Sequence, residues 1–282
     1  MTDPYAHCER LVEAVDKDRF LATLFAPAER RAHLHALYAF NVEIARVREA
    51  AHKALPGEMR IQWWRDVLNG RGYGDFKSNP VATAMLDTIQ KFRLPAAPLL
   101  ELLEARSFDL YDDPMPTMSE FESYARSTSS PLIELAAAVL VDGPDAALTE
   151  PARHAGMVYA IAGLIRALPI HAARRQLYVP LDLLERHQVD PGEIFEIKTS
   201  AGLRAALNEL RALALAHLSD LRATIHTIPA AAQPAFLPVV LAKPVLKRMV
   251  RRNYDPFMPG EPSQWRKQLI LWRAAWGGIL AV

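Results

Sequence analysis

Apolar residues recur at helical spacing along almost the whole chain. Between residues 34 and 45 they stand at Leu34, Leu37, Tyr38, Val42 and Ala45, at intervals of one, three or four positions. That period places them on one face of an α-helix, whereas the strict alternation that predicts a half-buried β-strand is hard to find. The pattern therefore predicts an all-α protein.

Clusters of proline and glycine divide this pattern into about ten helices. The predicted helices span residues 5–17, 29–52, 58–69, 80–91, 97–110, 118–141, 147–175, 199–227, 231–253 and 263–277. No repeat, linker or change in composition separates two halves of the chain. We therefore predict one domain over residues 1–282, in which residues 263–282 form a C-terminal amphipathic helix.

Composition excludes several classes of protein. Of the 282 residues, 51% are hydrophobic and 23% are charged, as in a folded globular chain rather than a disordered one. The net charge of +1 lacks the basic excess of a nucleic-acid binder, so no nucleic-acid partner is expected. The single cysteine, Cys8, allows no internal disulfide and no cysteine-based zinc site.

Signals for targeting and membrane insertion are missing from the sequence. The first ten residues contain Asp3 and Glu9 and no apolar run, which disfavours a signal or transit peptide. Glu134, Arg166 and Arg273 interrupt the long apolar stretches before they reach the roughly 18 residues that a spanning helix needs. We expect a cytoplasmic protein without a transmembrane helix.

Generic catalytic motifs are also missing. The sequence has no HExxH, GxGxxG, GxxxxGK[ST] or GxSxG. His33 and His35 point about 200° apart on the predicted helix, so they cannot share a metal ion and are interpreted as surface or capping residues. Asp112 and Asp113 precede Pro114, and turn chemistry explains them. No metal site is predicted.

The predicted helix 58–69 carries an aromatic cluster. Arg60, Trp63, Trp64 and Val67 are three or four positions apart, so a cation and aromatic rings share one helix face. Arg60, Trp63 and Trp64 are predicted to bind a partner. Core packing, with Arg60 lying along the tryptophans, is the alternative.

The C-terminal region combines basic and aromatic residues. Arg251 and Arg252 precede a helix in which Trp265, Trp272 and Trp276 repeat at helical spacing. Tryptophans flanked by cations suit the headgroup layer of an anionic membrane, so these five residues are predicted to contact a membrane surface. The same stripe also suits the core of a bundle, and the sequence leaves that alternative open.

Two ordered blocks of sequence resemble the squalene/phytoene synthase family. The first is Asp18-Arg-Phe-Leu-Ala-Thr-Leu-Phe-Ala-Pro followed by His35-Ala-Leu-Tyr-Ala-Phe-Asn-Val-Glu-Ile-Ala-Arg-Val-Arg-Glu, and the second is Gly163-Leu-Ile-Arg-Ala-Leu-Pro-Ile-His-Ala-Ala-Arg-Arg-Gln-Leu-Tyr-Val-Pro. The resemblance implies an isoprenoid-synthase helical bundle with a central cavity. In that family, aspartate-rich motifs on two facing helices hold Mg²⁺, whose preferred hard oxygen ligands grip the diphosphate of a prenyl substrate.

Most residues that this resemblance places at the two motifs are not acids. The positions are Ala45, Arg46 and Glu49 in the first motif and Gly163, Ala167 and His171 in the second. A methyl group cannot coordinate Mg²⁺, and an arginine repels it. We therefore expect no catalytic residue and no cofactor.

One branch of the family is more similar still. Ala39-Phe-Asn-Val-Glu-Ile-Ala-Arg-Val, Gly57-Glu-Met-Arg-Ile-Gln-Trp-Trp-Arg-Asp and Leu164-Ile-Arg-Ala-Leu-Pro resemble the complex I assembly factors of squalene/phytoene synthase type. The resemblance implies a non-catalytic protein, peripheral on the inner membrane. Its implied partner is a subunit or assembly intermediate of respiratory complex I, the NADH dehydrogenase.

Cations near the motifs suggest a ligand site that needs no metal ion. If Arg19, Arg46, Arg48 and Arg166 converge, they can hold the phosphate or carboxylate of a lipid or prenyl ligand directly. The predicted ligand-binding residues are Arg19, Glu43, Arg46 and Arg166. In the alternative, these arginines pair with Glu43, Glu49 and other neighbours.

Two other functions stay open at this point. One is an active head-to-head prenyl-diphosphate transferase, a Mg²⁺ enzyme with the rearranged ligands Glu43, Glu49, Asp109 and Asp113. The other is a lipid or quinone carrier that uses the apolar cavity.

Overall fold

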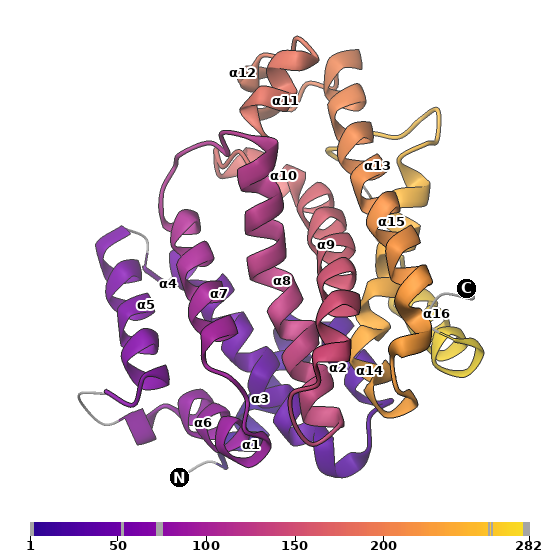
Figure 1. Cartoon of the computed structure of the whole chain (residues 1–282). Helices are drawn as coiled ribbons and strands as arrows, with labels where there is room; N and C mark the ends of the chain where they lie inside the picture. The colour runs from indigo at the N-terminus through magenta and orange to yellow at the C-terminus, as the bar shows by residue number, and fades with distance from the viewer. Residues whose placement is uncertain (1–2, 52–53, 72–75, 259, 261, 279–282) are drawn as a thin grey trace.

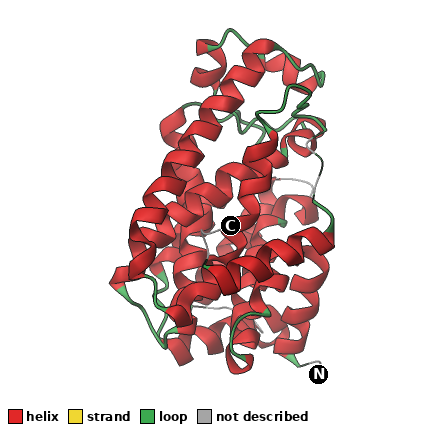
Figure 2. Ribbon diagram, turned by 90° about the vertical axis from the view of Figure 1, so that its right-hand side faces the viewer, coloured by secondary structure: helices red, strands yellow, loops and turns green. Residues whose placement is uncertain are grey.

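The computed structural model describes residues 3–51, 54–71, 76–258, 260 and 262–278, and these residues form helices and loops without a β-strand (Figures 1 and 2). The α-helices are α1 (Pro4–Val15), α2 (Lys17–Thr23), α3 (Ala28–Ala45), α4 (Val47–Ala51), α5 (Ala54–Leu68), α6 (Pro80–Phe92), α7 (Ala97–Ser107), α8 (Met118–Leu140), α9 (Thr149–Arg166), α10 (Leu168–Ala173), α11 (Leu181–Arg186), α12 (Pro191–Phe195), α13 (Ala201–Thr224), α14 (Gln233–Phe236), α15 (Ala242–Arg248) and α16 (Gln264–Gly277). Short 3₁₀ helices are η1 (Phe76–Ser78), η2 (Phe108–Leu110), η3 (Ala146–Leu148), η4 (Ile225–Thr227), η5 (Ala230–Ala232) and η6 (Leu237–Leu241). The all-α prediction is confirmed.

Side-chain caps fix the start of several long helices. Asn79 accepts hydrogen bonds from the N–H groups of Val81 and Ala82, and Pro80 occupies the first position of α6. Thr117 and Ser200 accept in the same way at the starts of α8 and α13. These side chains satisfy N–H groups that the helix itself leaves unpaired, so each helix begins at a defined residue.

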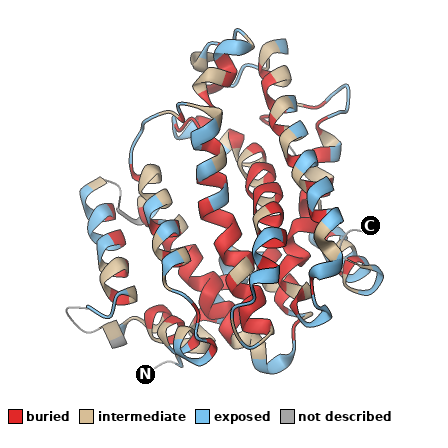
Figure 3. Cartoon of the chain, viewed as in Figure 1, coloured by how far each residue is buried: buried red, intermediate tan, exposed pale blue. Residues whose placement is uncertain are grey.

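Helices α8 and α9 lie side by side at the centre, and α13 packs against α9 (Figure 1). A Cβ atom on Gly156 of α9 would lie 2.5 Å from the backbone N and Cα of Ser130 in α8. Only glycine permits this close approach. Nearly all of α8 from Ser127 onward is buried, as Figure 3 shows, so this pair is the core around which the other helices pack.

Large apolar side chains join the outer helices to this centre. Trp64 of α5 is fully buried and meets the ring of Phe40 in α3 edge-on, with 4.8 Å between the ring centroids. Phe92, Phe121 and Phe236 are also fully buried. One continuous apolar core therefore runs through the bundle.

Two predicted helices are each broken at a single residue. The predicted helix 29–52 ends at Ala45 and resumes at Val47, because Arg46 leaves the helical conformation. The predicted helix 147–175 is broken at Ala167, just before Pro169, which lacks the N–H that would continue the ladder. Both breaks fall on positions that the family resemblance assigns to the metal-binding motifs.

Other boundaries also differ from the prediction. The helix predicted over 231–253 is wrong, because Pro234, Pro238 and Pro244 divide it into η5, α14, η6 and α15. The short helices α2, α11 and α12 were not predicted. In the described part of the chain, no helix has both the length and the hydropathy needed to cross a membrane.

Candidate functional site

The first motif segment lies at the junction of α3 and α4. Ala45 is half-buried, whereas Arg46 and Glu49 are exposed. Glu49 is held by two guanidinium groups, with its Oε2 3.1 Å from Nε of Arg46 and its Oε1 2.8 Å from an Nη of Arg174. Burial alone would raise the pKa of Glu49, but hydrogen bonds from Arg46 and Arg174 lower it. Both carboxylate oxygens are therefore engaged by protein cations.

The second motif segment lies at the junction of α9 and α10. Gly163, Ala167 and His171 are all half-buried. The ring of His171 lies against Tyr178, with 4.4 Å between the centroids, and burial lowers the pKa of His171 to about 4. Arg174 follows α10, so its ion pair with Glu49 links the two motif segments directly.

A second ion cluster joins α2, α9 and α16. One oxygen of Asp18 accepts from Arg166 at 3.2 Å, and the other accepts from Lys267 at 2.9 Å. The neighbouring Arg19 pairs with Asp16 at 2.6 Å, and its guanidinium lies over the rings of Tyr38 and Tyr159. The side chains of Asp18 and Lys267 are buried, so this cluster fixes α16 to the bundle.

A small polar cavity, called the central cavity below, lies between α2, α3, α7, α8 and α9. Its volume is about 140 Å³, and it is lined by Arg19, Asn41, Arg106, Tyr159 and Gly163 among others. In the described part of the chain, Oδ1 of Asn41 and Nε of Arg106 find no hydrogen-bond partner. Since ligand pockets usually measure roughly 300–1,000 Å³, this space suits a small polar group rather than a prenyl chain.

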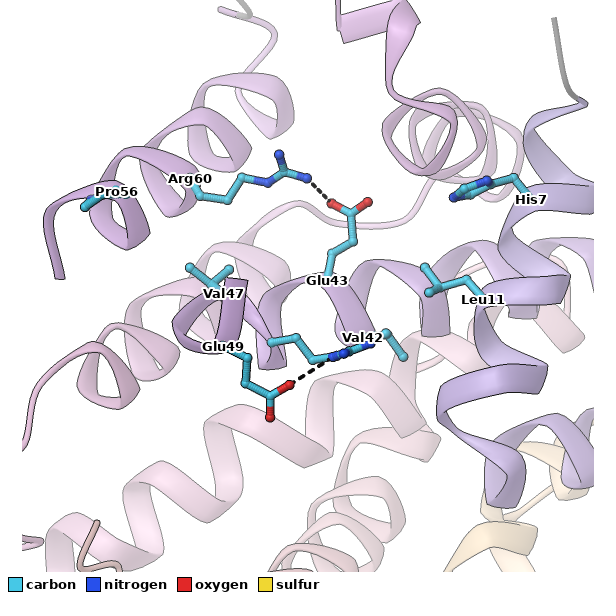
Figure 4. Close-up of a pocket in the computed structure, with 9 residues that line it drawn as sticks. His7, Leu11, Val42, Glu43, Val47, Glu49, Pro56 and Arg60 are labelled. Atoms are coloured by element: carbon cyan, nitrogen blue, oxygen red, sulfur yellow. Dashed lines mark hydrogen bonds and ion pairs between the residues drawn. The ribbon is translucent and has the colours of Figure 1, made fainter. Parts of the chain in front are cut away.

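A larger, open pocket of about 570 Å³ lies on the outer side of α3, next to α1 and α5. Figure 4 shows Arg60 reaching from α5 toward Glu43 of α3, and the two form an ion pair at 2.7 Å. Arg46 and Glu49 line the same pocket. Arg46 therefore lies in a different pocket from Arg19.

The structure contradicts the predicted convergence of four arginines. Arg19 lines the central cavity and Arg46 the outer pocket. Arg48 donates to the backbone oxygens of Asp109 and Tyr111 and pairs with Asp112, and Arg166 binds Asp18. Of the pairs named in the alternative, the one between Arg46 and Glu49 forms, whereas Glu43 pairs with Arg60. The other three arginines each pair with a different acid. Arg19, Glu43, Arg46 and Arg166 do not form one ligand site.

The acids proposed for the enzymatic alternative are also separated. Glu43 pairs with Arg60, while Asp109 accepts from Arg106, Tyr124 and Tyr178. Asp113 lies in an exposed loop. Among the residues described, no three of Glu43, Glu49, Asp109 and Asp113 bring carboxylate oxygens close enough to share one ion.

The aromatic cluster of α5 is divided between the core and the surface. Trp64 is fully buried, so its prediction as a partner-binding residue is wrong. Trp63 is half-buried beneath the guanidinium of Arg60, which lies 5.4 Å from the ring centroid. Leu55 and Met59, on the same side of α5 as Trp63, are each 66% exposed. His33 and His35, interpreted as surface or capping residues, are buried instead.

Helix α16 presents its tryptophans outward. Lys267, Leu271 and Ala274 face the bundle, whereas the exposed fractions of Trp265, Leu269, Trp272 and Trp276 are 60, 45, 56 and 78%. The alternative in which this stripe seals the core is wrong. Arg251 and Arg252 are exposed, but they line a separate cavity beside α13.

Sequence reasoning missed Arg174, Asp18 and Lys267. Arg174 lies within the second resembling block, but nothing in the sequence indicates that it faces Glu49, 125 positions earlier. Asp18 and Lys267 are 249 residues apart. Only the folded chain brings these charges together.

Comparisons with known proteins place the chain among relatives of known family. The chain is 30% identical over 269 residues to "NADH dehydrogenase (ubiquinone) complex I, assembly factor 6" of Rattus norvegicus, which covers 95% of this chain and 80% of the relative. It is 22% identical to "15-cis-phytoene synthase" of Synechocystis, covering 97% of this chain and 85% of that protein. A solved dehydrosqualene synthase superposes with a TM-score of 0.83 at 18% identity and covers 96% of this chain and 94% of its own. The family profile described as squalene/phytoene synthase matches residues 12–273, and the chain therefore belongs to the squalene/phytoene synthase family.

Proposed function

We propose that this chain is a non-catalytic assembly factor for respiratory complex I. The observation that carries this proposal is the similarity to the complex I assembly factor of the rat, which extends over 95% of the chain. The charges around the family's motif positions support the non-catalytic part. Ala45 and Ala167 offer no ligand, and Glu49 is already bound by Arg46 and Arg174.

Electrostatics explains why such a site disfavours the metal ions that would grip a diphosphate. A unit charge beside a divalent ion at about 4 Å interacts by about 8 kcal/mol at an effective dielectric of 20, and the sign is repulsive for an arginine. Arg46 and Arg174 place two positive charges on Glu49, the acid at these motif positions. The bundle is kept, while the metal-dependent chemistry is lost.

Deletion of the gene tests the assembly role. We expect membranes of the deletion strain to contain less assembled complex I on native gels, with subassemblies accumulating and NADH:quinone activity falling. Complementation with the unchanged chain should restore both. A normal amount of complex I in the deletion strain would remove the proposal.

An enzyme assay tests the non-catalytic part separately. The purified chain is incubated with farnesyl or geranylgeranyl diphosphate and Mg²⁺, next to an active synthase of the family as a positive control. We expect no squalene-type or phytoene-type product. Turnover by the chain would favour the prenyltransferase alternative, whatever the result of the deletion.

The exposed part of α5 is the proposed contact for the protein partner. Arg60 is exposed and Trp63 is half-buried, and the exposed Leu55 and Met59 extend the apolar surface along the same helix. Interfaces are enriched in aromatic residues, Met and Arg, which matches this composition. We expect Met59→Asp to reduce complementation of the deletion strain, while Gln62→Asp, on an exposed polar position of α5, leaves it unchanged.

The tryptophan face of α16 is the proposed contact with the membrane. Arg266 and Arg273 are exposed beside Trp265, Trp272 and Trp276, and α16 contains no acid. This combination suits anionic headgroups. We expect the chain to sediment with phosphatidylcholine vesicles only when phosphatidylglycerol is included. The double variant Trp272→Ala/Trp276→Ala should lose this binding and Gln268→Ala should keep it; equal sedimentation of both variants would contradict the proposal.

The central cavity supports a small anionic group as ligand, such as the headgroup of a lipid or prenyl compound. Arg19 contributes a cation, and Oδ1 of Asn41 and Nε of Arg106 are polar atoms that such a group or its water can satisfy. Titration with inorganic pyrophosphate, an anionic group without a prenyl chain, tests this in the presence of EDTA. We expect binding that Arg19→Met weakens, and the absence of binding at millimolar ligand would remove the ligand from the proposal.

A further inference from the structure

A cluster of histidine and carboxylate groups lies between α9 and α13, outside the sites described above. His154 belongs to α9, and His217 and Asp220 belong to α13, three positions apart and therefore on one face. The Nδ1 atoms of the two histidines are 2.9 Å apart, and Nδ1 of His154 is 3.5 Å from Oδ2 of Asp220. Three potential ligand atoms thus lie within 4.8 Å of one another.

In the absence of a metal ion, hydrogen bonds determine which ring nitrogens of His154 and His217 carry a proton. Arg153 lies 2.7 Å from Nε2 of His154, and a guanidinium can only donate, so Nε2 accepts. His154 then carries its proton on Nδ1 and donates it to Nδ1 of His217. Both imidazoles are neutral in this arrangement, as a metal ligand has to be.

We propose that His154, His217 and Asp220 bind a divalent transition-metal ion of the zinc type. Two imidazole nitrogens and one carboxylate oxygen are a ligand set that zinc accepts, and a water molecule completes four-coordination in such sites. In a tetrahedral site with metal–nitrogen distances of about 2.05 Å, ligand atoms are separated by roughly 3.3 Å. Two of the three separations between ligand atoms, 2.9 and 3.5 Å, bracket that value, and the third lies within 4.8 Å.

The surroundings of His154 allow the proton to move when the ion binds. Coordination through Nδ1 transfers the proton of this ring to Nε2, which then needs an acceptor in place of the donor Arg153. Glu150 can become this acceptor if its side chain moves closer, because its Oε1 is 3.9 Å from Nε2 of His154. The same oxygen is 3.5 Å from a guanidinium nitrogen of Arg153. A carboxylate behind a ligating histidine is the usual arrangement, since it fixes the ring orientation.

The three proposed ligands differ in how far they are buried. His154 is buried and held by the helix pair, His217 is half-buried, and Asp220 is exposed, so an ion can enter from solvent on the Asp220 side. The bound ion would tie α9 to α13 at the opposite side of α9 from the central cavity helices α2 and α3. His154, His217 and Asp220 are not among the motif positions, so an ion can bind here whether or not the chain assists complex I assembly.

Titration of the full chain, prepared without a polyhistidine tag, tests the site. We expect Zn²⁺ to bind with a stoichiometry of one and a micromolar Kd, to raise Tm by several degrees, and to be removed by EDTA. Co²⁺ should give the visible absorption bands of a four- or five-coordinate ion. No binding of Zn²⁺ at 100-fold excess over the expected micromolar Kd would overturn the proposal.

Matched variants locate the ion. His217→Ala and Asp220→Asn change residues that are not in the core, and we expect each to weaken Zn²⁺ binding at least tenfold while the circular dichroism spectrum stays unchanged. His226→Ala, at an exposed position in η4 just beyond α13, is the control and should bind as the unchanged chain does. Unweakened binding in both ligand variants, or loss in the control, would show that the ion sits elsewhere and would overturn the assignment.

Discussion

Replacing Lys267 by methionine tests how the C-terminal helix is held on the bundle. Lys267 of α16 donates to Asp18 at 2.9 Å, and Arg166 of α9 donates to the other oxygen of the same carboxylate at 3.2 Å. The side chains of Lys267 and Asp18 are only 5% and 9% exposed. Methionine keeps an unbranched apolar stem of similar length, so the substitution removes the charge with little change in packing.

The structure sets the magnitude of the effect. Breaking a buried ion pair costs about 3–5 kcal/mol when an uncompensated charge is left behind. Asp18 keeps Arg166 when Lys267 is replaced, so we expect Lys267→Met to reduce the free energy of unfolding by about 2 kcal/mol, below that range. Asp18→Asn weakens both pairs at once and should cost more than Lys267→Met, up to about 3–5 kcal/mol. In the double variant the two losses should fall short of additivity by about 1–3 kcal/mol.

Urea unfolding followed by circular dichroism measures these differences, and hydrogen exchange followed by mass spectrometry localises them. We expect faster exchange in α16 when Lys267 is replaced. Arg266→Met is the matched control, because Arg266 is the exposed neighbour of Lys267 and its loss should change stability by less than about 0.5 kcal/mol. If Lys267→Met unfolds like the control and α16 keeps its protection, the ion pair does not hold the helix and the reasoning is refuted.

Three further outcomes follow from burial and charge, all measured by urea unfolding. Trp64→Ala should cost about 3–5 kcal/mol because it empties a core position, whereas Trp63→Ala, at a half-buried position, should cost clearly less; equal costs would contradict the placement. Glu49→Gln should cost no more than about 1 kcal/mol, since its ion pairs with Arg46 and Arg174 are partly exposed, and a larger loss would mean a more buried bridge. Burial lowers the pKa of His171 to about 4, so the unfolded chain takes up a proton first as the pH falls and stability is lost between about pH 6.5 and pH 4. His171→Phe should reduce this acid-dependent loss by up to about 3 kcal/mol, and an unchanged pH dependence would contradict it.

Periodicity predicted the fold class because it reports a property of every helix. Apolar residues between positions 34 and 45 recur at helical spacing, and most of them are buried in α3. The helix breaks were harder to predict. Arg46 and Ala167 are both good helix formers, so local propensity gives no reason for a break at either position. Pro169 was a usable signal for the second break, since a proline within a helical pattern favours an interruption just before it.

The faces of α16 show why a sequence alone could not choose between membrane contact and core packing. The buried residues Lys267, Leu271 and Ala274 and the exposed Trp272 and Trp276 recur with the same period, so periodicity fits either face. Hydrophobicity favours burial of the tryptophans. The buried face nevertheless contains a lysine, because its partner Asp18 is supplied by a helix 249 residues earlier.

The same long-range pairing accounts for the wrong prediction about the arginines. The arginines near the motifs were predicted to bind an anionic ligand together, and the alternative partners named for them were Glu43, Glu49 and other neighbours. In the fold, Arg166 meets Asp18 and Arg48 meets Asp112, acids that lie 148 and 64 positions away along the chain. Charge patterning within one helix therefore predicts pairs over three or four residues, but it does not predict which distant acid a cation will meet.

The position of the buried charges fits a role in fixing geometry. A buried ion pair is weak evidence for stability, because desolvation offsets most of the attraction. The cluster of Asp18, Arg166 and Lys267 instead fixes the orientation of its helices, because two cations from α9 and α16 must both reach one carboxylate of α2. This requirement sets the rotation of α16 about its own axis and turns Trp272 and Trp276 to the surface. A chain that used α16 only to cover its core would be better served by the opposite rotation, so the charge at Lys267 favours an external contact for the tryptophan face.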